Sequence, residues 1–207
     1  MSTFTPKELY IMNGGNKVYI YKDGFGDVYS ATPAEEAEWA QEVVARALTR
    51  IDEEKSTTNI KFAVDTLRFH HYTALEALLL NKLKDTTPAR QIGFATALWM
   101  FYRYATSFDI ILHNLQQHRA ECLNDAFYAL GDFIKNPAAT AFIINCLEGD
   151  DEEYIAKANM TIGIWAWSHL PALRENSLLE LLRLGKADPE SFTLSIKRLK
   201  RTIGLIH

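Results

Sequence analysis

The sequence predicts an all-α protein, built as a right-handed α-solenoid of about four and a half antiparallel helix pairs with a small N-terminal β-hairpin. Three observations support this fold class. The 207 residues include only 6 prolines and 10 glycines, so long regular elements are expected. Five of the prolines directly follow a Thr, Asn or Asp, which are residue types that cap helices well. Apolar positions also recur about every 32 residues through most of the chain.

The first 31 residues are predicted to form a separate N-terminal region. A short helix is expected to begin at Pro6, behind a threonine cap. Residues 17–21 are rich in β-branched and aromatic side chains, and an Asp-Gly turn separates them from a similar run at 27–30. This pattern predicts a β-hairpin. Because an isolated hairpin is marginally stable in water, we expect it to pack on the rest of the chain.

Residues 32–207 are predicted to form one helical repeat domain. The first helix begins with a capping box, in which Thr32 and Glu35 satisfy each other's backbone amides. The short connections require consecutive helices to lie antiparallel as neighbours. The expected helices span residues 33–50, 57–70, 72–85, 88–104, 107–118, 120–135, 137–148, 151–168, 173–185 and 189–205.

The helices recur in pairs, and each pair carries one apolar anchor on its first helix and one on its second. The spacings are 31, 32, 32 and 37 residues between the first-helix anchors Leu67, Leu98, Leu130, Ile162 and Leu199. They are 32, 32 and 37 residues between the second-helix anchors Leu83, Leu115, Leu147 and Leu184. Both series therefore contain the same insertion, near Pro171. Each pair exposes apolar surface that the next pair can cover, which predicts a stacked superhelix with a concave face.

Other positions share a phase of the repeat. Trp165 has the phase of apolar residues in earlier units, which predicts a core position, whereas Trp167 has the phase of Arg103 and Lys135, which predicts an exposed one. Gly131 and Gly163 also coincide, and we expect neighbouring helices to approach closely at both glycines.

Helix pairs of 30–40 residues joined by short turns resemble the HEAT and armadillo repeat families. The resemblance covers about residues 33–205. It implies that the second helices line the concave face and that this face binds a partner.

Polar residues stand two positions before three of the second-helix anchors, at Asn81, His113 and Asn145. They lie about 160° around the helix from the anchor leucine, so they face away from the core. Asp109 and Gln117 extend the same ridge, one turn before and one turn after His113. These five residues form the predicted partner-binding ridge, with an ordinary solvated helix face as the alternative.

Charge and composition exclude several classes of protein. The formal net charge of −4 argues against strong non-specific binding to nucleic acid, which depends on Lys and Arg neutralising phosphates. The basic run at residues 197–201 suits either an anionic partner or the solvated face of a terminal helix. Cys122 and Cys146 are expected to be reduced core thiols. No apolar run reaches membrane-spanning length and no signal-peptide pattern opens the sequence, so a cytoplasmic location is expected.

No motif predicts catalysis, a metal site or a cofactor. The sequence has no phosphate-binding loop, and Gly24 to Gly26 form the one G-x-G, which lacks the third glycine of a dinucleotide site. None of the six histidines is followed by Glu, and no His-x-x-x-His occurs, so no metal ligand set is expected.

The leading functional prediction is a non-catalytic module that binds another protein on its concave face, as an adaptor, an assembly factor or a toxin-neutralising inhibitor. The alternative is a HEAT-like DNA-lesion-binding protein or DNA glycosylase, a branch of the resembled family that uses tryptophan and an acid near the lesion. The candidate tryptophans for that alternative are Trp39, Trp99, Trp165 and Trp167. The negative charge favours the first prediction, and the sequence predicts no particular oligomeric state.

Overall fold

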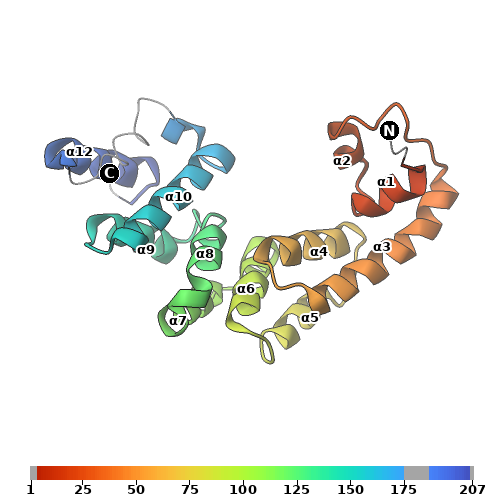
Figure 1. Ribbon diagram of the computed structural model, residues 1–207, viewed down its shortest axis with the longest axis horizontal. Coiled ribbons are helices and arrows are strands. Elements are labelled where there is room, and N and C mark those ends of the chain that lie inside the picture. Colours follow the sequence, from red (N-terminus) through yellow and green to blue (C-terminus); the bar gives the residue numbers. More distant parts are fainter. Residues whose placement is uncertain (1–3, 175–186, 206–207) are drawn as a thin grey trace. The chain divides into compact units, whose positions relative to one another are not determined.

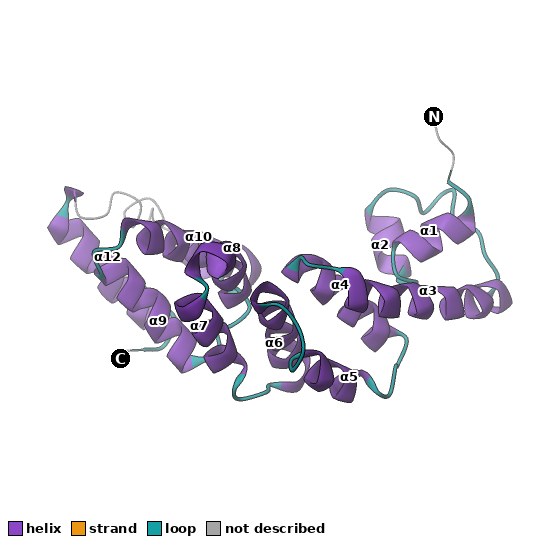
Figure 2. Ribbon diagram, turned by 60° about the horizontal axis from the view of Figure 1, so that its bottom comes forward, coloured by secondary structure: helices purple, strands orange, loops and turns teal. Residues whose placement is uncertain are grey.

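The computed structural model describes residues 4–174 and 187–205, and throughout these ranges the regular elements are helices (Figures 1 and 2). The all-α fold class is therefore confirmed for the described residues. The chain divides into two compact units, Met1–Leu98 and Trp99–His207. The division falls within helix α6 (Pro88–Tyr102).

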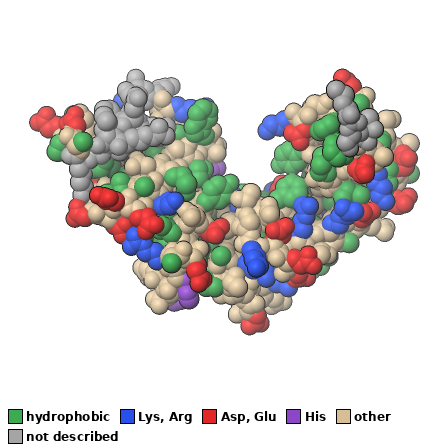
Figure 3. Space-filling view, viewed as in Figure 1, with side chains coloured by type: hydrophobic (Ala, Val, Ile, Leu, Met, Phe, Trp, Pro, Cys, Tyr) green, Lys and Arg blue, Asp and Glu red, His purple; other side chains and the backbone are tan. Residues whose placement is uncertain are grey.

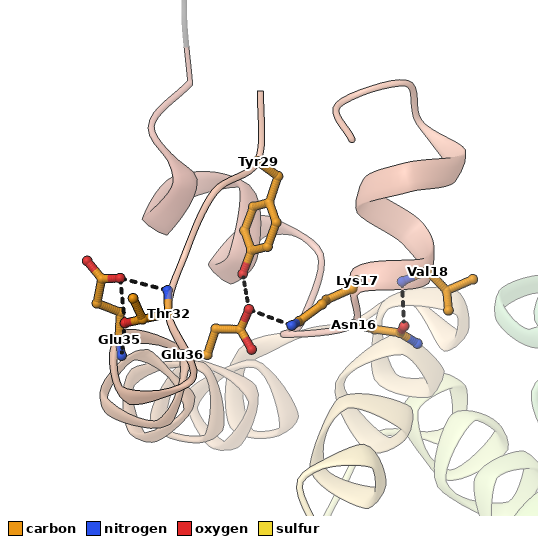
Figure 4. Close-up of polar contacts among 7 residues, drawn as sticks. All are labelled: Asn16, Lys17, Val18, Tyr29, Thr32, Glu35 and Glu36. Carbon is orange, nitrogen blue, oxygen red and sulfur yellow. Dashed lines mark hydrogen bonds and ion pairs between the residues drawn. The ribbon is translucent and has the colours of Figure 1, made fainter. Parts of the chain in front are cut away.

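The first unit contains five helices before α6 among its described residues: α1 (Pro6–Met12), α2 (Lys17–Lys22), α3 (Pro33–Glu53), α4 (Thr57–Phe69) and α5 (Leu75–Lys82). The capping box predicted at Thr32 forms at the start of α3, and α1 begins with a capping box as well. Thr32 and Glu35 show the pattern, because the Glu35 carboxylate accepts from the Thr32 backbone N–H at 2.8 Å (Figure 4). The long α3 packs against both α1 and α4, so it holds this unit together.

The predicted hairpin is wrong, because residues 17–22 form the helix α2 and residues 27–30 form no strand. The side chain of Asn16 caps α2 by accepting a hydrogen bond from the Val18 N–H at 3.0 Å (Figure 4). The Asp-Gly pair ends this helix instead of turning a hairpin. Gly24 has a φ of +83°, and the following Phe25 N–H donates to the Ile20 carbonyl at 3.0 Å. This geometry is a Schellman motif, in which glycine after the helix adopts the left-handed conformation.

A small core joins this N-terminal region to α3. It consists of the buried residues Leu9, Tyr10, Ile20, Tyr29 and Val43. Glu36 on α3 links two residues at the edge of this core. The Glu36 Oε1 atom accepts a hydrogen bond from the Tyr29 hydroxyl at 2.9 Å and forms an ion pair with Lys17 Nζ at 2.7 Å (Figure 4). The N-terminal region therefore packs on the helices that follow it.

The described part of the second unit continues from α6 through α7 (Ser107–Gln117), α8 (Arg119–Leu130), α9 (Pro137–Glu148), α10 (Glu152–Ser168), the 3₁₀ helix η1 (Pro171–Arg174) and α12 (Pro189–Thr202). Helix α8 packs against α7 and α10, and α10 also packs against α9 and η1. This makes α10 the central element of the unit.

The repeat anchors occupy core positions. All five first-helix anchors are buried, and so are Leu115 and Leu147 among the second-helix anchors, whereas Leu83 is only partly buried. Leu184 and most of the helix expected over 173–185 lie outside the described residues. The other expected helices are present, although α8 ends at Leu130 rather than at residue 135. The superhelix and its concave face stay predictions.

Cys122 and Cys146 are free and buried, as predicted. Burial raises the pKa of the Cys122 thiol and raises that of Cys146 to about 12. Both side chains are therefore protonated core residues at neutral pH.

Candidate partner-binding surface

An open groove of about 880 Å³ runs along one face of α10 in the second unit. We call it the α10 groove. One wall residue, Tyr128, comes from α8, and the others are Glu152, Ile155, Ala156, Asn159, Met160, Gly163, Ile164, Trp167 and Ser168.

The residues of this face lie on one side of α10 because they are spaced along the sequence at helical intervals. Positions 152, 156, 160 and 164 follow one another at four-residue steps, as do 155, 159, 163 and 167, and the two series are offset by three residues, so all eight share one side of α10. Other α10 residues, including Ile162 and Trp165, are buried in the core. Helix α10 is therefore apolar on two sides, and one of the two is not covered by any described helix.

Large apolar side chains are exposed along the α10 groove. The exposed fraction is 70% for Trp167, 40% for Tyr128 and 38% for Met160. Figure 3 shows hydrophobic side chains, in green, on the surface of this part of the chain. Aromatic residues and methionine are enriched at protein interfaces, and a continuous apolar patch marks an interaction surface more often than isolated residues do.

Gly163 leaves an empty notch in the middle of the α10 groove. A Cβ built on Gly163 meets no atom of residues 4–174 or 187–205 within 4 Å, whereas a Cβ on Gly131 would come within 2.7 Å of Ile164 Cγ2. The predicted close helix approach is therefore confirmed at Gly131 and wrong at Gly163. The two glycines share a repeat phase, but a neighbouring side chain fills only the first space.

Arg174 fixes the position of Trp167 at one end of the groove. Its guanidinium lies over the Trp167 ring, 4.3 Å from the centroid. Its Nε donates to the Ala166 carbonyl at 2.7 Å, and its Nη2 donates to the Trp167 carbonyl. These bonds satisfy carbonyls at the end of α10 that lack a helical partner. The exposed indole is thus held on one face by a cation.

The opposite end of the groove lies at the start of α10 and is acidic. Arg119 forms two hydrogen bonds there, at 2.9 Å each, to Asp151 and to Glu153. This pairing lowers the pKa of Asp151. Glu152 lines the groove itself, and no ion pair joins it to another described residue. The groove therefore runs from a carboxylate at one end to the Arg174 cation at the other.

The five residues of the predicted partner-binding ridge are all exposed, as the sequence predicts. Asp109, His113 and Gln117 follow one another on a single face of α7. Asn145 lies on α9, and Asn81 lies on α5 in the other unit. The structure thus gathers three of the five on one helix, and their role in binding stays a prediction.

The tryptophans divide between structural and exposed positions. Trp165 is buried and its Nε1 donates to the Leu130 carbonyl at 3.2 Å. Trp99 stacks on Phe133 with ring centroids 5.1 Å apart, and its Nε1 donates to the Asp132 carbonyl at 3.1 Å. Trp167 is by contrast an exposed side chain, as its repeat phase predicts.

Within residues 4–174 and 187–205, no group of three or more His, Cys, Asp and Glu side chains is placed to hold a metal ion. In the same ranges, no helix combines the length and the apolar character needed to cross a membrane.

Comparison with protein-family models, with curated proteins and with solved structures finds no match to this chain.

The sequence interpretation missed most of the α10 groove. It predicted an exposed Trp167 but assigned no role to Tyr128 or Met160. A usable signal was present in residues 155–167. Their apolar side chains occupy more than one side of the helix, whereas a helix with a single core-facing side needs only one apolar stripe.

Proposed function

We propose that this chain is a protein-interaction module that binds an amphipathic helix of a partner protein in the α10 groove. The observation that carries the proposal is the space beside Gly163, which no described residue fills and which interrupts an exposed apolar stripe. Helix-in-groove recognition places apolar anchors at i, i+3, i+4 and i+7 of the bound helix in an apolar groove, and a glycine in the groove lets that helix approach closely.

The length of the groove and the charges at its ends indicate the length and the charge pattern of the partner helix. The stripe from Glu152 to Trp167 spans 16 residues, which corresponds to roughly 22 Å between its ends, or about four helical turns. Glu152 at one end favours Lys or Arg on the partner, and Arg174 near the other end favours Asp or Glu. Met160 supplies an adaptable apolar contact between these ends, and Trp167, which Arg174 holds in place, supplies a fixed aromatic one.

The predicted roles of adaptor, assembly factor and toxin-neutralising inhibitor all remain compatible with this proposal, because each requires a bound protein. The ridge of Asn81, Asp109, His113, Gln117 and Asn145 is the competing surface for the same function. The two surfaces use different residues, so separate variants distinguish them.

Affinity capture from source cells tests the proposal. The baits are the wild-type chain, Gly163→Leu, which fills the notch, and the triple variant Asp109→Ala, His113→Ala, Gln117→Ala, which removes the α7 part of the ridge. We expect one captured protein to be lost with Gly163→Leu and retained with the ridge variant. Capture that is insensitive to Gly163→Leu but lost with the ridge variant would assign binding to the ridge. Salt-dependent capture of duplex DNA in place of a protein would contradict both surfaces.

A further inference from the structure

The first unit contains a second concave site, formed where α1 and α4 both pack against α3. This α3 pocket has a volume of about 270 Å³, which is close to the lower limit for small-molecule sites. Its lining residues are Phe4, Glu8, Ile11, Met12, Gly14, Val43, Arg46, Ala47, Arg50, Phe62, Ala63 and Thr66.

The floor of the α3 pocket is apolar because small side chains face one another across two helices. Val43 and Ala47 from α3 and Ala63 from α4 are all buried. The short side chains of the two alanines leave the space that forms the pocket. Ile11 and Phe62 add larger apolar walls. An apolar body of a ligand would therefore find favourable contacts here.

One end of the pocket is lined by the turn after α1. Gly14 has a φ of +61°, and a Cβ on it would come within 2.6 Å of Thr66 Oγ1. The Thr66 hydroxyl donates to the Phe62 carbonyl at 2.9 Å, and His70 Nε2 lies 3.0 Å from the Gly14 carbonyl oxygen. The polar groups at this end thus have partners within the protein.

Three charged residues line the pocket, and two of them already have polar partners within the protein. The Glu8 carboxylate accepts from the Thr5 backbone N–H at 2.8 Å, as part of a capping box. Arg46 pairs with Glu42 at 2.6 Å. Arg50 lies over the Phe62 ring, 5.8 Å from its centroid, and forms no ion pair with any residue in the described part of the chain. Its guanidinium is the cation that remains available to a ligand.

We propose that the α3 pocket binds a small amphipathic carboxylate, with its apolar body between α3 and α4 and its carboxylate on Arg50. The planar fork of arginine matches a carboxylate in two parallel hydrogen bonds. A ligand with a single negative charge fits better than a phosphate monoester, because Arg50 offers one cationic charge and the Glu8 carboxylate, which also lines the pocket, repels a second negative charge. The site lies wholly within the first unit, so it is independent of the α10 groove.

Titration of the full chain with straight-chain carboxylates of about six to twelve carbons, followed by backbone amide NMR, tests this proposal. We expect chemical-shift changes at Gly14, Ala47 and Ala63. The methyl ester of the same acid should bind about tenfold more weakly, which is the loss expected for one charge-assisted contact.

Two variants of the same helix separate charge from cavity. Arg50→Gln is expected to weaken binding of the acid about tenfold, whereas Arg46→Gln changes it by less than about threefold because Glu42 already compensates Arg46. Ala47→Leu fills the pocket and should abolish binding. Equal affinities for acid and ester, unchanged binding to Arg50→Gln, or shift changes that avoid the pocket would each overturn the proposal.

Discussion

Ile164 occupies the space that Gly131 leaves open, so closely that a Cβ on Gly131 would lie 2.7 Å from Ile164 Cγ2. This contact joins α10 to the end of α8 in the second unit, beside the α10 groove. The equivalent repeat position, Gly163, faces an empty groove instead. The same residue type at the same phase therefore serves packing in one place and leaves a surface open in the other.

This difference predicts opposite effects of one substitution at the two glycines. Gly131→Ala forces Ile164 to shift and should lower the free energy of unfolding by about 1–3 kcal/mol. Gly163→Ala adds helix propensity in an open helix interior and should raise it by about 0.5–1 kcal/mol. Urea unfolding of both variants measures the effect, and a change of the same sign at both positions would contradict the packing described here.

Trp165 and Trp167, near the end of α10, should also differ in how much each contributes to the free energy of unfolding. Trp165→Ala removes a buried ring and is expected to lower the free energy of unfolding by about 3–5 kcal/mol. Trp167→Ala, which truncates an exposed ring, should cost less than about 1 kcal/mol. Chemical unfolding followed by far-ultraviolet circular dichroism compares them without relying on tryptophan fluorescence. Equal losses would mean that Trp167 is a core residue and not part of an open surface.

A third prediction concerns the helix α2, which stands where a hairpin was expected. Asn16→Ala removes the side chain that caps α2 and should lower the free energy of unfolding by about 1 kcal/mol. Asn16→Ser keeps a capping oxygen and is the matched control, with little expected change. Faster exchange of the Val18 amide hydrogen in the alanine variant reports the lost bond directly. If alanine and serine behave alike in both measurements, the cap does not form.

The ion pair at the start of α10 predicts a pH dependence. The pKa of the Asp151 carboxyl is lowered chiefly by hydrogen bonds from Arg119. A lowered folded-state pKa stabilises the folded chain above the unfolded-state pKa, and this contribution is lost as the pH falls through the folded-state value. Asp151→Asn should therefore be less stable than the wild type at neutral pH, with a deficit that shrinks from about pH 5 towards about pH 3. Urea unfolding across this range measures the deficit, and a constant deficit would exclude a role for the charge.

Helix positions were predictable because the local signals were strong and consistent. Proline behind a capping side chain marks the starts of α3, α9 and α12 to the residue. The 32-residue spacing identified buried anchors because a residue that returns to the same side of each helix pair meets the same core.

Two predictions, the N-terminal hairpin and the close helix approach at Gly163, were wrong because the same local sequence pattern is compatible with two different structures. An Asp-Gly pair suits a tight hairpin turn and also a helix C-terminus, and the Asn16 cap together with the buried Ile20 favours the helix. Repeat phase likewise identified Gly163 as equivalent to Gly131, but only the packed structure reveals that no side chain fills its notch. The α10 groove and the α3 pocket both depend on such spaces between helices, which a sequence pattern does not encode residue by residue.

Site-specific photocrosslinking in source cells tests the proposed helix-binding function most directly. A photoreactive phenylalanine derivative replaces Met160 in the α10 groove, or replaces His113 on the exposed ridge as the comparison. We expect one partner protein to be crosslinked at position 160, through a helical segment, and to be lost when Gly163→Leu is added. Crosslinks to a protein at position 113 but none at position 160 would contradict the account.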